Sequence, residues 1–266
     1  MPSRRFIENS VLGVIAVVLA GARMLPDAQR TGPVIEAAVA MVAPTPAYAA
    51  TVPHPVAERV EAAVGALGNV VRPLSDPHAL EDAFKSYFAY KAAHPDAVRK
   101  PFLYFVDYGL PSTTPRGYLF DMDSLRIVEG PFAVAHGRGS STTRYGVPTH
   151  FSNASGSAAT SLGLYLAQEL YDFHGHTGGQ SYGSVGLRLM GVSTGFNDEA
   201  RARGVVAHGA PYVTETVAGR SEGCPAMEPS RAARLLPKLG NGGLVFLFAP
   251  DKNWLASDPW LTGNVG

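Results

Sequence analysis

The chain has 266 residues, with 22 basic and 22 acidic side chains that leave no formal net charge. A nucleic-acid binder normally carries a basic surplus, so this balance argues against nucleic acid as a partner. Hydrophobic residues make up 46% of the chain, which is enough for a core and argues against wholesale disorder. The single cysteine excludes an intrachain disulfide and a metal site built from several thiolates. These counts describe a neutral globular protein with one thiol.

The N-terminus has the order of features that is typical of an export signal. Two arginines precede an apolar run at 11–22, which is shorter than the roughly 20 residues of a membrane span and suits the apolar region of a secretory signal. Small-residue triplets at 20–22 and 47–49 are alternative cleavage sites, and a short membrane anchor is the other interpretation. We therefore expect residues 1–49 to be a leader and linker. Export would place the protein in the periplasm or cell envelope, with membrane contact only through the leader.

A helical segment is predicted next, over 54–97. Apolar residues at helical spacing predict one helix over 56–67, which a glycine follows. A second helix is predicted to begin with Asp76 as its N-cap and to end near Ala93, before a His-Pro pair. We expect these helices to form an N-terminal appendage.

From residue 100 the pattern changes to short apolar runs between glycines and prolines. Such runs are typical of strands and predict one mainly β domain over 100–250. The seven strand-like runs are 102–108, 117–123, 126–137, 161–173, 184–192, 204–209 and 242–250. The fourth run could instead be helical around 168–169. Two short helices are expected at 197–203 and 229–239, and residues 251–266 are expected to be a C-terminal tail.

One segment carries residue types suited to nucleophilic catalysis. An apolar strand leads into His208, and Cys224 follows 16 positions later. A thiol attacks only as the thiolate, so it needs a base or a positive charge nearby. His208 can supply the base, and Arg220 can supply the charge. Gly223 permits backbone conformations closed to other residues, which would let neighbouring amides point at a developing oxyanion. Acyl transfer by such a pair needs no metal and no cofactor.

The same segment carries a family resemblance. Its pattern of His-Gly, a connecting loop and Ser-x-Gly-Cys resembles the signature of the YkuD-type L,D-transpeptidases, which act on the bacterial cell wall. The stretches VDYGLPSTTPRGYLFDMD, VAHGRGS, HFSNASGSAATSLGLY and GFNDEARARGVVAHGAPYV extend the likeness. Together they resemble the murein L,D-transpeptidase catalytic domain family, in its Cys-Pro branch, over about residues 100–250. Taken together the motifs are specific, whereas Ser-x-Gly-Cys alone would be weak.

The resemblance implies a fold, a reaction and a partner. The fold would be a β-sandwich or barrel-like catalytic domain with a few short helices. The thiolate would attack the diaminopimelate carbonyl of a peptidoglycan tetrapeptide stem, release D-alanine and pass the acyl group to an amine of a neighbouring stem, forming a 3→3 cross-link. Peptidoglycan stem peptides are the implied partners, and carbapenem-type inhibitors are expected to acylate the thiol. Two alternatives stay open: an L,D-carboxypeptidase that hydrolyses the same thioester, and a non-catalytic peptidoglycan-binding protein of the same fold.

The resemblance also implies catalytic roles, residue by residue. Cys224 would be the nucleophile and His208 the base, with the Gly209 carbonyl orienting the imidazole. The amides of Gly223 and Cys224 would form the oxyanion hole, and Ser221 would shape the loop.

The sequence leaves open which group binds the substrate carboxylate. Better-known members of the wider family have His or Lys where this chain has Glu222. Arg220 and Arg188 are the candidates for the carboxylate, and His136 and Asn153 are further candidate substrate-binding residues. The run 173–182 reads as a glycine-rich insertion that could reshape the rim of the cleft. No metal site is expected at its two histidines, because no cysteine or carboxylate cluster flanks them.

Overall fold

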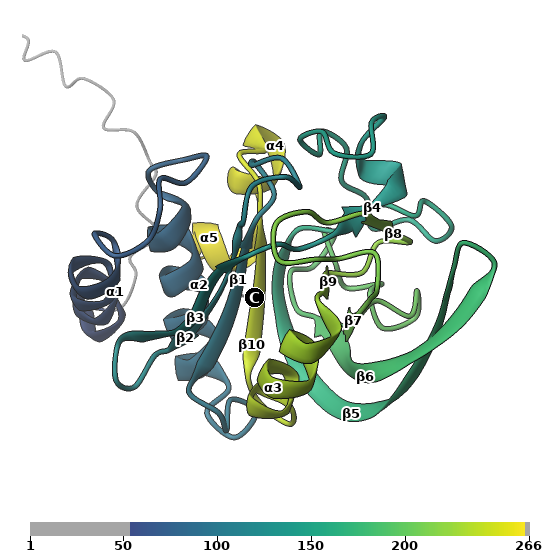
Figure 1. Cartoon of the computed structure of the whole chain (residues 1–266). Coiled ribbons are helices and arrows are strands. Elements are labelled where there is room, and N and C mark those ends of the chain that lie inside the picture. Colours follow the sequence, from purple (N-terminus) through teal and green to yellow (C-terminus); the bar gives the residue numbers. More distant parts are fainter. Residues whose placement is uncertain (1–53, 264–266) are drawn as a thin grey trace, which may run out of the picture. The chain divides into compact units, whose positions relative to one another are not determined.

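A computed structural model describes residues 54–263, all within one compact unit that spans 46–266. The predicted leader, residues 1–49, lies outside the described residues. Within 54–263 no helix is both long and apolar enough to cross a membrane. The fold is mainly β, as predicted, with a large mixed sheet and short helices (Figure 1).

The helices lie mostly at the two ends of the described chain. They are α1 (His54–Leu67), α2 (Ala79–Ala93), the short 3₁₀ turn η1 (Arg138–Ser140), α3 (Pro229–Leu239), α4 (Lys252–Leu255) and α5 (Pro259–Thr262). Helix α3 begins where the sequence predicts, because the Glu228 carboxylate accepts hydrogen bonds from the amides of Ser230 and Arg231. Helix α2 begins later than predicted. Asp76 accepts from the amide of His78 at 2.8 Å, in a turn that precedes the helix.

The strands form one eight-stranded sheet and one two-stranded sheet. They are β1 (Phe102–Asp107), β2 (Gly117–Asp121), β3 (Arg126–Phe132), β4 (His136–Gly137), β5 (Gly163–Thr177), β6 (Gln180–Gly191), β7 (Val206–Gly209), β8 (Arg220–Ser221), β9 (Ala226–Met227) and β10 (Leu244–Phe248). The order in the large sheet is β3-β2-β1-β10-β5-β6-β7-β9, and β4 pairs with β8. Three pairs are parallel, namely β1 with β10, β7 with β9, and β4 with β8.

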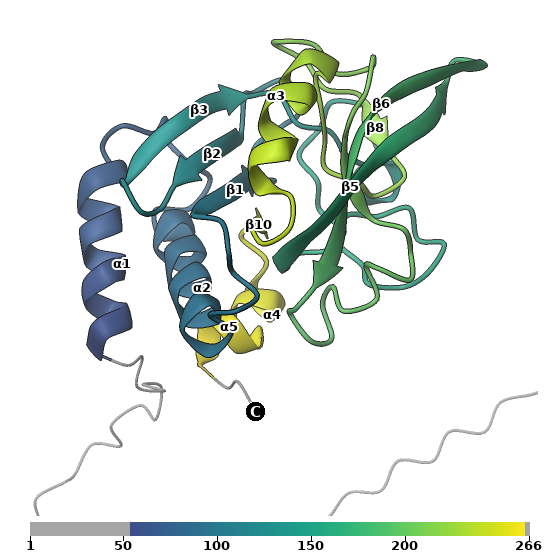
Figure 2. The ribbon, with the colours of Figure 1, turned by 90° about the horizontal axis from the view of Figure 1, so that it is seen from below.

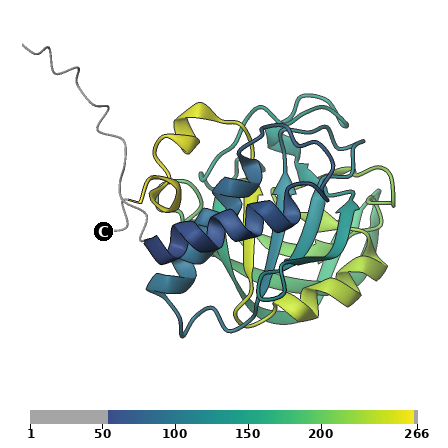
Figure 3. The same cartoon turned by 90° about the vertical axis from the view of Figure 1, so that its left-hand side faces the viewer.

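The centre of the large sheet is covered on both sides. Strand β10 is buried along its whole length and β1 almost so, as expected for strands that helices cover on both faces. Helices α1 and α2 lie together on one side of β1 and β10 (Figures 2 and 3), and α3 packs across β6 and β7 on the other (Figure 2). Both ends of the described chain belong to this core. Helices α1 and α2 share its apolar cluster, and the expected C-terminal tail supplies the buried Trp254 and Trp260.

Strands β5 and β6 form a long hairpin that includes the predicted insertion. Their register runs from the pair Tyr165 and Gly191 to the pair Thr177 and Gln180. Gly178 and Gly179 close the turn at φ +56° and +78°, the conformation that two-residue hairpin turns require. Residues 168–169 fall in an irregularity of this strand pair rather than in a helix. Within β6, only residues 186–188 pair with β7, and the outer part of the β5–β6 hairpin curves past β7 and β9 (Figure 1).

The helix predicted at 197–203 is absent from the structure, which has turns there. Asn197 explains the difference, because its side chain accepts from the amide of Ser193 at 2.9 Å and donates to the carbonyl of Leu164 at 2.9 Å. A short polar side chain that bonds backbone groups in this way competes with helix formation. Gly195 and Gly204, both at positive φ, bound the segment.

Candidate active site

His208 lies in β7, the strand next to the edge strand β9 of the large sheet. In the strand register it pairs with Gly186 of β6 on one side and with Ala226 of β9 on the other. The side chain is almost fully buried. Cys224 precedes Ala226 by two residues, so the parallel pairing of β7 with β9 brings residues 220–225, the cysteine loop, to the strand that carries the histidine. This strand pair thus brings His208 and the loop of Cys224 together, although the two residues lie 16 positions apart in sequence.

The hydrogen bond of His208 decides which of its ring nitrogens can act as a base. Nδ1 lies 3.0 Å from the carbonyl oxygen of Gly209, which is the contact that the resemblance implied. A carbonyl oxygen can only accept a hydrogen bond, so Nδ1 carries the proton of the neutral ring. Nε2 is therefore left with its lone pair and can take a proton from a thiol.

Phe173 of the hairpin covers one face of the imidazole. The ring centroids are 4.1 Å apart and the ring planes meet at 25°. Burial lowers the pKa of His208 to about 4, and the hydrogen bond to Gly209 offsets only part of this effect. The imidazole is therefore neutral near pH 7, which is the state a general base needs. Residues 173–182, read from sequence as an insertion at the rim, thus supply a ring in contact with the candidate base.

Cys224 is the only cysteine of the chain and is partly exposed. Burial raises the pKa of its thiol, while a backbone hydrogen bond from Val206 and the charge of Arg203 act in the opposite direction. Glu222 raises this pKa further. The resting groups are therefore a thiol on the cysteine loop and a neutral imidazole on β7. Arg220 was the cation expected from sequence to favour the thiolate, but Arg203 is the cation that acts on the thiol pKa.

The loop before the cysteine is held by its own polar groups. The hydroxyl of Ser221 donates to the carbonyl of Cys224 at 2.7 Å and accepts from the amide of Gly223 at 3.2 Å. Gly223 has φ +121°, and a Cβ atom there would lie 2.8 Å from the backbone oxygen of Ala159. Both the backbone angle and the space require glycine. Ser221 thus shapes the loop, while the Gly223 amide has a long hydrogen bond inside it.

The candidate substrate-binding residues occupy different environments. Arg220 is half-buried at the start of the cysteine loop and donates to the carbonyl of Ser141 at 3.0 Å. Arg188 lies in β6, where it forms a salt bridge with Glu169 at 3.0 Å and its guanidinium lies over the ring of Tyr171. Of these two arginines, only Arg220 belongs to the cysteine loop.

Asn153 is already engaged on the loop that follows η1. Its amide nitrogen donates to Asp198 at 2.7 Å and its oxygen accepts from the amide of Glu199. These bonds tie two loops together. Glu222, on the cysteine loop, receives two hydrogen bonds from Arg138 at 2.7 and 2.9 Å, in an exposed pair that contributes little stability.

His136 is fully buried beside a charged group that sequence analysis missed. It lies in β4, paired in parallel register with Arg220 of β8. Nη2 of Arg116 lies 2.9 Å from Nδ1 of His136. Arginine can only donate, so Nδ1 accepts and Nε2 carries the proton, the opposite tautomer to that of His208. Burial and the charges of Arg116 and Arg220 lower the pKa of His136 to about 3.

Arg116 immediately precedes β2 in the chain and is completely buried. Its guanidinium donates to the carbonyls of Val134 and Leu110 and lies over the ring of Tyr108 at 4.7 Å. Burial lowers its pKa to about 10, so it is charged at neutral pH. The sequence carries no signal for this position, because the partners of Arg116 come from two other segments, 108–110 and 134–136.

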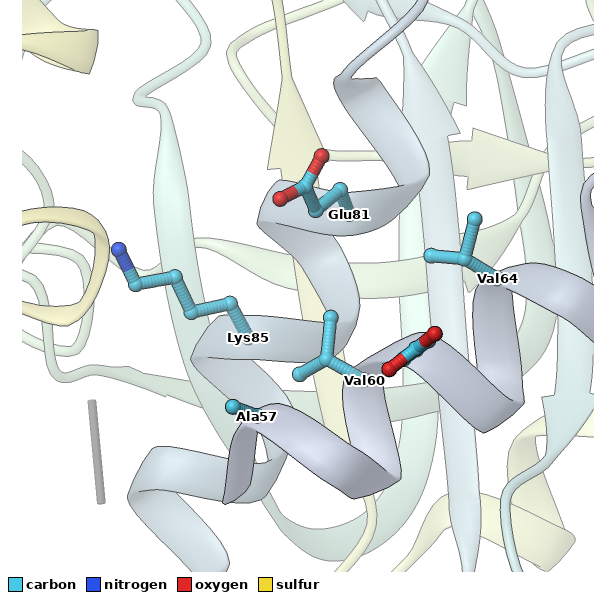
Figure 4. A pocket seen from close by; sticks show the side chains of 6 residues that line it. Ala57, Val60, Val64, Glu81 and Lys85 are labelled. Atoms are coloured by element: carbon cyan, nitrogen blue, oxygen red, sulfur yellow. The ribbon is translucent and has the colours of Figure 1, made fainter. Parts of the chain in front are cut away.

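One of the cavities lies away from these residues. It holds about 370 Å³ between α1 and α2, and its lining combines apolar side chains with two acids and one lysine (Figure 4). The lining residues are Ala57, Val60, Glu61, Val64, Glu81 and Lys85. None of them belongs to the loop or strands around Cys224.

The strand pairing thus places the loop of Cys224 next to the strand of His208 in a mainly β domain, and comparison with known proteins places the chain more narrowly. Residues 72–248, about two thirds of the chain, match the family described as the L,D-transpeptidase catalytic domain. The chain therefore belongs to this family, and the predicted resemblance is confirmed. No curated protein matches the sequence.

Two solved structures show a distant likeness. An L,D-transpeptidase from Mycobacterium smegmatis is 13% identical with a TM-score of 0.36, and the L,D-transpeptidase LdtMt1 in complex with imipenem is 14% identical with a TM-score of 0.33. Each comparison covers 56% of this chain and 59% of the other. The chain thus spans less than two thirds of either relative.

Proposed function

We propose that this protein is a peptidoglycan L,D-transpeptidase with Cys224 as its nucleophile and His208 as its base. Family membership supports the reaction class. The observation that carries the assignment of residues is the tautomer of His208. Its Nδ1 is committed to Gly209, and its Nε2 lone pair is left free on the strand beside the cysteine loop.

The proposed reaction begins with proton transfer from the thiol to Nε2 of His208. Sγ of Cys224 attacks the diaminopimelate carbonyl of a donor stem, and the carbonyl oxygen becomes an oxyanion. Collapse of this intermediate breaks the bond to the terminal D-alanine, whose amine takes the proton from the imidazolium. The product is a thioester on Cys224. An acceptor amine then attacks the thioester, loses its proton to Nε2, and leaves as the new amide while the thiol is restored.

The amides of Gly223 and Cys224 are the proposed donors to the oxyanion. Backbone N–H groups that point at developing charge can contribute several kcal/mol to such a step. The hydrogen bond from Gly223 to Ser221 is long, at 3.2 Å. A charged oxygen would therefore compete well for that donor, because charge-assisted hydrogen bonds are stronger than neutral ones.

Arg220 is the proposed site for the substrate carboxylate. It lies in the cysteine loop and is half-buried, and it donates only to a neutral carbonyl among its described partners. Arg188 supports this role less well because it is already paired with Glu169. His136 has no exposed surface, so we assign it to support Arg220 from behind rather than to touch the substrate.

Two neighbouring functions use the same residues differently. Transfer of the acyl group to water would make the protein an L,D-carboxypeptidase, which needs the same nucleophile and base. A binding protein of the same fold would need neither, so the neutral imidazole beside the loop favours an enzyme. The proposal includes export to the cell envelope, where peptidoglycan is found.

Acylation by a carbapenem, read by intact mass, tests the thiol enzyme. We expect one adduct on the wild type and none on Cys224→Ala, with Cys224→Ser as a matched control for folding. An equal adduct on Cys224→Ala, or none on folded wild type, would contradict the proposal. Incubation with tetrapeptide-bearing peptidoglycan then separates the reactions. Cross-linked 3→3 dimers support transfer, whereas tripeptides alone identify a carboxypeptidase.

A further inference from the structure

Arg203 is anchored by four hydrogen bonds in the turns before β7. Nη1 donates to the carbonyl of Ser152 at 2.8 Å and to the hydroxyl of Ser161 at 3.3 Å. Nη2 donates to the hydroxyl of Ser157 at 3.2 Å and to the carbonyl of Ala159 at 2.8 Å. The guanidinium is therefore fixed in both position and orientation.

All four acceptors are uncharged. Among the described residues no carboxylate pairs with Arg203, in contrast to its neighbour Arg201, which pairs with Glu169 at 2.9 Å. Arg203 is also half-buried. A fixed cation with little access to water and no counter-ion favours a negative charge in its surroundings.

The cysteine loop lies directly against this cation. The carbonyl of Ala159 that accepts from Arg203 is the atom that a Cβ on Gly223 would meet at 2.8 Å. The same Cβ position is 3.6 Å from Nη2 of Arg203. Gly223 is bonded to Cys224, so the guanidinium, the Ala159 carbonyl and the backbone of the loop form one packed unit.

We propose that Arg203 is a positioning residue that holds the 152–161 loop against Gly223 and stabilises the thiolate of Cys224. This proposal rests on the proposed role of Cys224 as the nucleophile. His208 is neutral at working pH, so in the resting state its ring carries no positive charge that could stabilise a thiolate. Arg203 supplies the missing positive charge from a fixed site.

The other groups around the thiol leave this role to Arg203. Glu222, on the cysteine loop, acts in the opposite direction and raises the thiol pKa. Five tyrosines from the surrounding elements also face Cys224, and burial raises the pKa of each, so they stay uncharged below pH 10. They are Tyr108, Tyr165, Tyr171, Tyr182 and Tyr212.

The pH dependence of alkylation by iodoacetamide tests the proposal without any peptidoglycan. The chain has one cysteine, so every adduct on the full-length protein reports Cys224. We expect Arg203→Gln to raise the thiol pKa by about one unit, the lower end of the effect of a nearby charge, and to slow alkylation at pH 7 about tenfold. Arg203→Lys keeps the charge, so its thiol pKa should stay within about half a unit of wild type. Arg201→Gln, two residues away and exposed, is the matched control and should change neither.

An unchanged thiol pKa in folded Arg203→Gln overturns the proposal, and so does the same rise in Arg201→Gln. If circular dichroism shows that Arg203→Gln does not fold, the thiol pKa of Arg203→Lys tests the proposal on its own. That variant loses most of the hydrogen bonds but keeps the charge, so a preserved pKa supports the proposal and a rise of one unit contradicts it. Loss of carbapenem acylation with a normal response to Arg203→Gln would count against the proposed function and leave this inference standing.

Discussion

The ring of Phe173 lies on the imidazole of His208, with the two centroids 4.1 Å apart. The residues are 35 positions apart in sequence and come from strands that are not neighbours in the sheet. The contact exists because the β5–β6 hairpin curves past β7 (Figure 1). It covers one face of the candidate base and so is part of the burial that lowers its pKa.

Replacing Phe173 tests that shielding. In Phe173→Leu, water reaches the imidazole, so we expect the pKa of His208 to rise by about one unit and the acid limb of the activity profile to move up with it. The imidazole C–H shift in a proton NMR titration measures this pKa, with His208→Gln to assign the signal. Tyr171→Leu, which removes a neighbouring ring that contacts Phe173 but not His208, is the control. An unchanged pKa in Phe173→Leu would show that the stack does not control protonation.

The low pKa of His208 also predicts the acid side of the activity profile. The base works only when neutral, so the acid limb of kcat/KM should lie near pH 4 and not near the ordinary value of 6.5. Measuring D-alanine release from a tetrapeptide from about pH 3 to pH 9 would locate it. A limb close to 6.5 would mean that His208 is not the base or is not buried in the working enzyme.

The same shift has a consequence for stability. The pKa of His208 is lower in the folded than in the unfolded protein, so the unfolded state binds more protons between the two values. The stability contributed by the neutral ring is thus complete above about pH 6.5 and is lost as pH falls toward 4. Urea unfolding at pH 7 and pH 5 should show wild type losing about 2 kcal/mol more than His208→Gln. Equal losses in the two proteins would contradict a buried neutral His208.

Gly223→Ala should disable the cysteine loop. An alanine there needs φ +121° and would push its Cβ to 2.8 Å from the Ala159 carbonyl, so we expect a cost of about 1 to 3 kcal/mol and a loss of most turnover. Gly178→Ala is the matched control, since its φ is also positive but no atom lies within 4 Å of its Cβ position. That variant should keep its activity. Thermal melting and carbapenem acylation measure the two effects, and equal activity of both variants would be the contrary result.

Arg116 should matter chiefly for stability. Arg116→Met leaves the buried carbonyl of Val134, the partly buried carbonyl of Leu110 and Nδ1 of His136 without a donor, and we expect a loss of roughly 3 kcal/mol or more in the free energy of unfolding. Arg234→Met removes an exposed arginine that pairs with Glu129, and should cost less than about 1 kcal/mol. Urea titration at pH 7 compares the two. Similar midpoints would show that Arg116 contributes no more than a surface pair.

The sequence by itself determined the class of the fold and the residues of the candidate site. Apolar runs between glycines and prolines marked the strands, because the alternation of a strand and the needs of a turn are local properties of a chain. The lone Cys224 and the His-Gly pair were readable for the same reason, since both lie in one continuous segment. The prediction of a helix at 197–203 was wrong because the side chain of Asn197 forms hydrogen bonds with backbone groups outside that segment. A local pattern does not reveal such bonds, and the structure has turns there.

The tertiary structure alone decided how that site is surrounded. Phe173 on the imidazole, Arg203 behind the cysteine loop and Arg116 beneath His136 all depend on contacts between segments far apart in the chain. Such contacts follow from strand order, register and the curl of the hairpin, which no local pattern encodes. The single cysteine thus identified the candidate nucleophile from sequence, and the packing around it set the charges and the pKa values under which it would react.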